Sequence, residues 1–314
     1  MRRALAAVVA LVLLGAGLVA AQPSAPTPRT YLLGALNLLR THSIDRDRVD
    51  WPRAEAEALR AAEGVSTYSG TYPAIRTVLA ELGNPHSALL TPAQARPLSA
   101  ATIEVPSSSV SDGIAVLKIP GFVSDPAGER RYVAAGVAAL RAVEAQASCG
   151  WIVDLRDDTG GNMWPMLTVL APLLGDGIAG SFSAPGAAPT FWSVRDGRAW
   201  SGEVPRTEEA NPVRLSRPAP PVAVLTSRIT ASSGKATLIA FRGLGRAATF
   251  GGATAGFATA NEVFALADGA KLVVTSAVDV DRAGRRYGAW PIAPDHPTPD
   301  PDTAAGQWLR GRCA

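Results

Sequence analysis

Small hydroxyl residues and a glycine stand between two apolar runs in the second half of the chain. Residues 222–225 (VAVL) are short and apolar, as in a buried strand, and residues 236–241 (ATLIAF) suit a buried helix. Between them lies the polar turn 230–234 (TASSG). A strand that turns directly into a helix brings serine to the helix N-terminus, where free N–H groups can stabilise an oxyanion. The turn therefore suits a nucleophilic serine, and it also suits an ordinary N-cap serine.

A second turn of this kind follows residues 151–155 (WIVDL), another apolar run. The turn reads DDTGGN and contains Gly160 and Gly161. Glycine lets the backbone approach a substrate carbonyl closely, so this turn could supply a second oxyanion donor. A plain tight turn would have the same composition.

Two further stretches complete an ordered set, residues 250–256 (FGGATAG) with the turn ADG at 267–269, and NPHS at 84–87. The set resembles the tail-specific, or C-terminal-processing, serine peptidases and their tricorn-like and retinoid-binding-protein-like relatives, over roughly residues 70–300. The resemblance implies an α/β fold with a mixed sheet and a crotonase-like catalytic core. It also implies a peptide or protein substrate, Ser232 as nucleophile, and Ser233, Gly160 and Gly161 around the oxyanion. Only 25 residues separate Ser87 from Gly113, too few for the PDZ domain that is usual in the family.

The general base departs from the family pattern. Many members carry a lysine where this chain has Phe257, and phenylalanine cannot accept a proton. His86 matches the catalytic histidine of the tricorn-like branch, and Glu262 is the nearest acid in sequence that could orient it. Lys235 is the other candidate base, because it follows Ser232 in an S-x-x-K arrangement.

Two other functions remain open at this point. A catalytically silent binding protein on the same fold would explain the missing lysine. An S-x-x-K amidase would use Lys235, although the S-D-N and K-T-G elements of penicillin-recognising enzymes are absent.

Composition excludes several other classes. The 314 residues are 47% hydrophobic and 18% charged, which is typical of a globular protein with a sizeable core. The net charge is only +3 and no basic run occurs, so we expect no nucleic-acid partner. No metal-ligand spacing and no phosphate-binding glycine loop are present, so we expect neither metal nor cofactor.

The N-terminus predicts export. Residues 1–21 hold two arginines, an apolar run and a small-residue cleavage site, which is typical of a secretory signal peptide and a periplasmic or extracellular protein. An uncleaved membrane anchor is the alternative, and only then would the membrane be a partner. In an exported chain, Cys149 and Cys313 could form one disulfide; two unrelated cysteines are equally consistent with the sequence.

The remaining chain predicts a helical segment followed by an α/β core. After a linker over 22–28, helical patterns within 31–40, 52–62 and 72–82 predict a small N-terminal subdomain, residues 29–98. From 99 to 300, strands and helices alternate as in a mixed-sheet core. Strands are expected at 113–119, 150–155, 222–225 and 247–250, hairpins at 191–200 and 262–278, and helices at 131–147 and 164–174. Residues 301–314 are expected to be a C-terminal tail.

Overall fold

The computed structural model describes residues 25–96, 102–257 and 259–313. The predicted signal peptide and part of the predicted linker lie outside these residues. The helices are α1 Pro28–His42, α2 Trp51–Ala61, α3 Tyr72–Leu82, α4 Pro126–Val143, α5 Met163–Leu174, α6 Ser233–Phe241 and α7 Pro301–Arg310. The strands are β1 Ala88–Leu90, β2 Ser107–Ser111, β3 Ile114–Lys118, β4 Gly150–Asp154, β5 Gly177–Ser183, β6 Thr190–Arg195, β7 Arg198–Ser201, β8 Val204–Pro205, β9 Val222–Thr226, β10 Ala247–Gly251, β11 Thr259–Ala265, β12 Lys271–Asp281 and β13 His296–Pro297.

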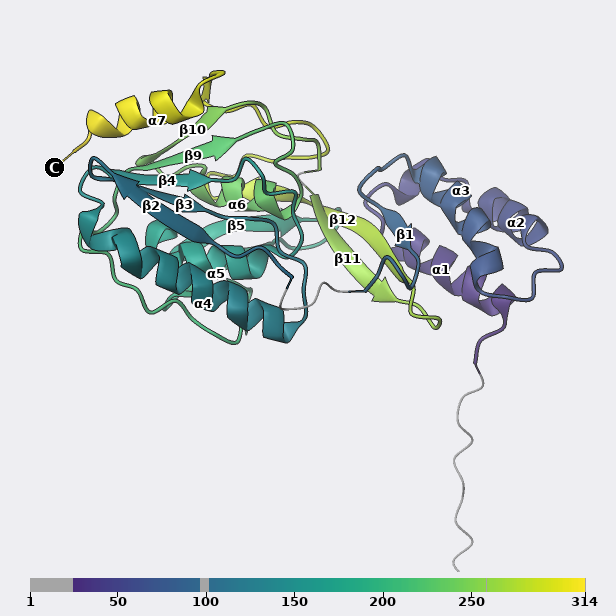
Figure 1. Cartoon of the computed structure of the whole chain (residues 1–314). Coiled ribbons are helices and arrows are strands. Elements are labelled where there is room, and N and C mark those ends of the chain that lie inside the picture. The colour runs from purple at the N-terminus through teal and green to yellow at the C-terminus, as the bar shows by residue number, and fades with distance from the viewer. Residues whose placement is uncertain (1–24, 97–101, 258, 314) are drawn as a thin grey trace, which may run out of the picture.

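One mixed sheet and one antiparallel sheet form the core, as expected for the α/β fold class. One has the strand order β13-β10-β9-β4-β3-β2, in which every pair except β2–β3 is parallel. The other has the order β1-β12-β5-β6-β7-β8, with β11 paired to β12, and its pairs are antiparallel. Helices α5 and α6 contact each other and strands of the second sheet (Figure 1). Because its neighbours enclose it, α5 buries eleven of its twelve residues.

The N-terminal helices share a hydrophobic core with the second sheet. Leu32, Ile75 and Leu82 from these helices cluster with Leu272 and Val274 of β12. The segment also contributes β1, which pairs with residues 271–273 of β12. The predicted subdomain is therefore helical but contacts the core through strand β1, which lies beside β12 (Figure 1), and through the shared hydrophobic cluster.

The tip of the β11–β12 hairpin reinforces this docking. The hydroxyls of Tyr31 and Tyr72 both donate to the carboxylate of Asp268, whose pKa they help to lower. Burial and the Asp268 carboxylate raise the pKa of Tyr72 to about 12, so both phenols stay protonated donors at neutral pH. Two sets of contacts thus hold the N-terminal helices on the hairpin, the strand pairing of β1 with β12 and the hydrogen bonds to Asp268.

The C-terminal segment differs from the expected tail. Residues 301–310 form α7, whose N-terminus is capped by the side chain of Asp300. Ala305 and Leu309 of this helix pack on the face of the first sheet formed by Ile152 and Leu225. Two apolar residues four apart were too few to predict a helix from sequence.

Cys149 and Cys313 form a disulfide between the start of β4 and the residues after α7. The bridge joins residues 164 apart in sequence and so attaches α7 to the sheet. Loop closure of this size is expected to contribute about 5 kcal/mol to the free energy of unfolding.

We therefore predict a mass about two daltons below that of the fully reduced chain, with no thiol open to alkylation. Mass spectrometry of unreduced, denatured protein measures both quantities. Two alkylated cysteines would show that the bridge does not form. Reduction should lower the melting temperature, whereas a chain that never formed the bridge would melt unchanged.

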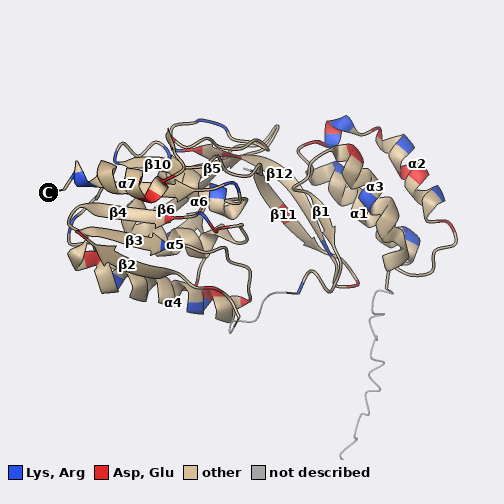
Figure 2. Cartoon of the chain, turned by 45° about the horizontal axis from the view of Figure 1, so that its top comes forward, with Lys and Arg blue, Asp and Glu red and all other residues tan. Residues whose placement is uncertain are grey.

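Charged residues of both signs occur along α2, α3 and α4 (Figure 2). In the part of the chain that the structure describes, no helix is both long and apolar enough to cross a membrane.

Candidate active site

Ser232 lies at the turn between β9 and α6, as the residue that precedes the helix. Its backbone has φ 49° and ψ −120°, a strained conformation for a residue with a side chain. The turn is held in place by Thr230, whose hydroxyl donates to the carbonyl of Leu155 and accepts from the amide of Ser227. The strain is thus supported by the neighbouring strand, and the Ser232 side chain is left half-buried rather than capping the helix.

His86 comes from the loop that follows α3. The loop leaves the helix at Gly83 in the left-handed conformation, and the amide of His86 donates to the side chain of Asn84. The amide of Asn261 lies 3.4 Å from the His86 carbonyl, and its oxygen accepts from Thr275 of β12. These contacts attach the histidine loop to β11 and β12.

The side chains of His86 and Ser232 meet at the serine turn. His86 Nε2 lies 3.0 Å from Ser232 Oγ, and His86 Nδ1 lies 2.7 Å from Thr259 Oγ1. A neutral imidazole carries one N–H. When Nδ1–H donates to Thr259, Nε2 is free to accept the Ser232 proton.

The surroundings of His86 favour the neutral ring. Burial, with a smaller contribution from the positive charge of Lys235, lowers the pKa of His86 to about 4. The ring of Phe257 packs against the imidazole, with the centroids 5.2 Å apart. Phe257, which stands where many relatives carry lysine, therefore covers the histidine in this chain.

The glycine turn adjoins the serine turn. A Cβ on Gly160 would lie 2.7 Å from the Cβ of Ser232, so only glycine permits this approach. The Gly160 amide donates to Asp158 at 2.9 Å and is not free for a substrate. In the described residues, no partner is recorded for the amides of Gly161 and Ser233, and the Ser233 hydroxyl donates to the Gly161 carbonyl. Of the three residues predicted around the oxyanion, Gly161 and Ser233 therefore remain candidate donors and Gly160 does not.

Asp158 accepts hydrogen bonds from both the glycine turn and the serine turn. It is fully buried, and burial raises its pKa to about 7. Besides accepting from the Gly160 amide through its side chain, it accepts the Ala231 amide through its carbonyl. Asp158 thus joins the glycine turn to the residue that precedes Ser232.

The structure does not bring Glu262 to His86. Glu262 Oε2 lies 3.1 Å from His42 Nδ1 of α1, and nearly half of its side chain is exposed. Thr259, the first residue of β11, presents its hydroxyl to the imidazole instead, and a register shift between Ala260 and Asn261 separates it from Glu262. The group that contacts His86 Nδ1 is therefore a hydroxyl, not a carboxylate.

Lys235 is likewise not brought to Ser232. It is fully buried, and its Nζ donates to the carbonyl of Trp290 at 3.2 Å. Burial lowers its pKa to about 8, against the opposing attraction of Asp279. The S-x-x-K spacing that suggested a dyad places the ammonium on the side of α6 that faces β12.

Thr259 and Asp158 were missed by sequence reasoning. Thr259 is separated from His86 by 173 residues, and an isolated threonine on a strand carries no catalytic signal. Asp158 was visible as an acid in a glycine turn, which is also the usual composition of a solvated turn.

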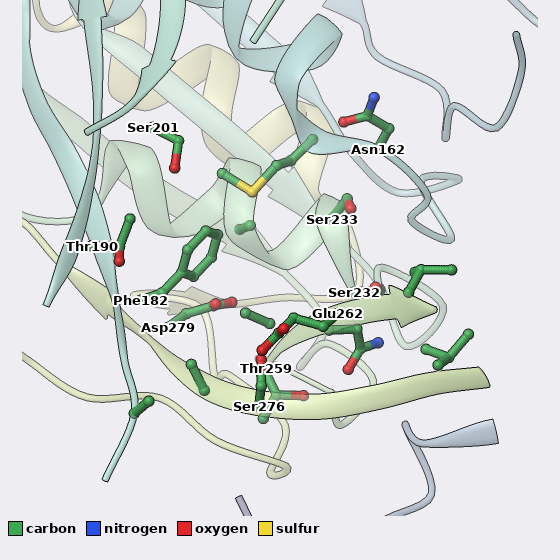
Figure 3. Close-up of a pocket in the computed structure, with 18 of the residues that line it drawn as sticks. Asn162, Phe182, Thr190, Ser201, Ser232, Ser233, Thr259, Glu262, Ser276 and Asp279 are labelled. Carbon is green, nitrogen blue, oxygen red and sulfur yellow. The ribbon is translucent and has the colours of Figure 1, made fainter. Parts of the chain in front are cut away.

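An open cleft of about 940 Å³ contains Ser232, Ser233 and Gly161 together with Thr259 and Glu262. Figure 3 shows Ser232 and Ser233 on one side of this cleft, with Phe182 and Asp279 on the other. Among the described residues, no three His, Cys, Asp or Glu side chains group as metal ligands would. The chemistry in the cleft is that of a hydroxyl beside an imidazole, with two amides nearby.

Comparisons with known proteins show which family and which fold the chain shares. The sequence model of Peptidase family S41 matches residues 113–298. The chain is 26% identical over 287 residues to the nisin-resistance protein of Lactococcus lactis subsp. lactis, covering 91% of this chain and 88% of that one.

Solved structures extend the similarity. A lipoprotein from Streptococcus agalactiae is similar with a TM-score of 0.80 and 25% identity, over 92% of this chain and 98% of that chain. The photosystem II D1 C-terminal processing protease shares the fold, with a TM-score of 0.62 at 16% identity, over 92% and 98% of the two chains. The family match covers more than half of the sequence and confirms the resemblance first drawn from the ordered motifs. The chain belongs to peptidase family S41.

Proposed function

We propose that the chain is an exported serine peptidase in which Ser232 is the nucleophile and His86 the general base. The observation that carries the proposal is the 3.0 Å contact between Ser232 Oγ and His86 Nε2 at a strained strand-to-helix turn. Membership of a peptidase family makes a peptide or protein the substrate class. The similarity to a lipoprotein and the N-terminal pattern both support export.

In the proposed reaction, Ser232 Oγ attacks the peptide carbonyl carbon while His86 Nε2 takes the hydroxyl proton. The carbonyl oxygen becomes negative and accepts from the amides of Ser233 and Gly161. His86 then gives its proton to the leaving amine, and the C–N bond breaks. Water, deprotonated by His86, releases the acyl group and restores Ser232.

Thr259 replaces the acid of a three-membered triad in this proposal. Its hydroxyl accepts from Nδ1–H and so holds the ring in the tautomer that the reaction needs. A neutral hydroxyl stabilises the imidazolium less than a carboxylate would, which fits a histidine whose pKa is low.

A fluorophosphonate probe tests the proposal directly, because it reacts with a serine that a neighbouring base has activated. We expect labelling of the exported protein at Ser232 and none in Ser232→Ala. An unlabelled wild-type protein that hydrolyses no peptide would favour the silent binding protein instead.

The oxyanion assignment gives a separate prediction. A Cβ at Gly161 would lie 1.9 Å from the carbonyl oxygen of Phe122, so Gly161→Ala must displace the amide that faces the substrate. We expect kcat/KM to fall by at least about 100-fold, the usual loss for one oxyanion donor. Gly177→Ala is the matched control, since Gly177 has a similar positive φ but open space around it. Equal effects of the two substitutions would contradict the assignment.

A further inference from the structure

Asp279 of β12 has an unusual environment for a carboxylate. It lines the cleft that contains Ser232, yet only 2% of the residue is exposed. Within the described residues neither of its carboxylate oxygens accepts a hydrogen bond, and Oδ1 is buried without any partner. A buried acceptor without a donor is destabilising, so the arrangement calls for a function.

The nearest opposite charge does not use the hydrogen-bonding capacity of Asp279. Lys235 attracts the carboxylate, but its Nζ donates to Trp290 and forms no ion pair with Asp279 within 4.0 Å. Burial outweighs this attraction and raises the pKa of Asp279 to about 7. A donor that entered the cleft would therefore find an acceptor that the protein itself leaves unsatisfied.

Part of the cleft wall near Asp279 is apolar. Phe182, Met163, Ala236 and Ala277 line the same cleft. Figure 3 shows Asp279 beside Phe182, across the cleft from Ser232 and Ser233. Glu262 also lines the cleft but is half-exposed and contacts His42, so among the described residues of the cleft Asp279 is the buried carboxylate without a partner. Apolar side chains beside a buried carboxylate fit the methylene chain and the charged end of a long basic side chain.

We infer that Asp279 is a specificity residue, which binds the ammonium or guanidinium of a lysine or arginine on the amino side of the bond to be cleaved. The inference rests on the proposed peptidase function and adds its substrate class. A site that hydrogen-bonds one substrate group discriminates strongly against an analogue without it, because its own buried group then stays unpaired.

The test compares peptides that differ only in having lysine or norleucine at this position, which changes the terminal group and keeps the methylene chain. For the wild-type exported protein we expect kcat/KM to favour lysine by about 30-fold or more. In Asp279→Asn, which keeps the shape of the side chain, we expect the two peptides to agree within about threefold. An unchanged preference in Asp279→Asn would overturn the inference.

Asp281→Asn is the matched control. Asp281 is a buried acid on the same strand, but its side chain accepts from Tyr287 and from the Ala283 and Arg285 amides, and it does not line the cleft. We expect Asp281→Asn to keep the preference for lysine. If Asp279 were purely structural, Asp279→Asn would behave like this control, with a lower melting temperature and an intact preference for lysine.

Fluorophosphonate labelling distinguishes failure of the proposed peptidase activity from failure of the proposed role of Asp279. A wild-type protein that is labelled and hydrolyses peptides without preferring lysine sinks this inference and leaves the peptidase proposal standing. If Asp279→Asn does not fold, the wild-type ratio alone decides. A wild-type protein that is neither labelled nor active overturns both.

Discussion

Ser232→Ala should reduce peptide hydrolysis by at least about 10⁴-fold, because among the described residues Ser232 carries the hydroxyl that contacts His86 Nε2, whereas Thr259 contacts Nδ1. Stability should hardly change. The Ser232 side chain makes no capping hydrogen bond to α6, so its loss removes no helix contact. Relief of the positive φ is not expected either, since alanine has the same steric preference. Initial rates and thermal melts of the two proteins measure both effects.

Ser233→Ala serves as the control for this substitution. It keeps the backbone amide and loses only the hydrogen bond to the Gly161 carbonyl, so we expect a loss of about tenfold. If Ser232→Ala kept full activity while Ser233→Ala lost it, the nucleophile would be one residue further along.

His86→Ala should lower kcat/KM by at least about 100-fold, the usual contribution of a general base. In the wild type, the pH dependence carries the more specific signal. Protonated His86 cannot accept the Ser232 proton, so activity is lost as the pH falls through the pKa of the ring. Because burial and Lys235 lower that pKa to about 4, kcat/KM should rise near pH 4 and be flat by pH 6.5, where an ordinary imidazole is only half neutral.

Two variants test the assignment of the base. Lys235→Met removes the positive charge that helps to lower the His86 pKa, so the ascending limb should move to higher pH with the activity above pH 7 retained. Loss of activity at every pH in Lys235→Met would make Lys235 the base instead. His296→Ala is the histidine control, because His296 stacks on Phe250, whereas the imidazole that contacts Ser232 is that of His86.

The fold was largely predictable because its elements carry strong local patterns. Residues 222–225 and 150–155 are apolar runs of strand length, and β9 and β4 are buried on both faces. Helix α3 has the bounds predicted from its apolar spacing. Strand β5, with glycine at 177 and 180, and the helix α7 carry weak patterns, since contacts with distant segments determine them.

The sequence predicted only those site residues that belong to a local motif. Ser232 and Gly161 stand at turns that sequence can place next to strands. The contact between His86 and Thr259 depends on how a loop after α3 meets the start of β11, which no local pattern encodes. Glu262 was predicted to orient His86 because it was the nearest acid in sequence. The group that contacts His86 Nδ1 is instead the hydroxyl of Thr259, three residues earlier on the same strand.

The docking of the N-terminal helices on the β11–β12 hairpin has a consequence for how the enzyme matures. His86 precedes the hairpin in the chain, and Ser232 lies 146 residues after His86. A chain that crosses a membrane from its N-terminus delivers the base long before the nucleophile. In the proposed peptidase the pair forms only when the helices have bound the finished hairpin, so we expect a chain without the hairpin to be inactive. Two separately made fragments, divided between β1 and β2, should accordingly be inactive alone and regain hydrolysis when mixed.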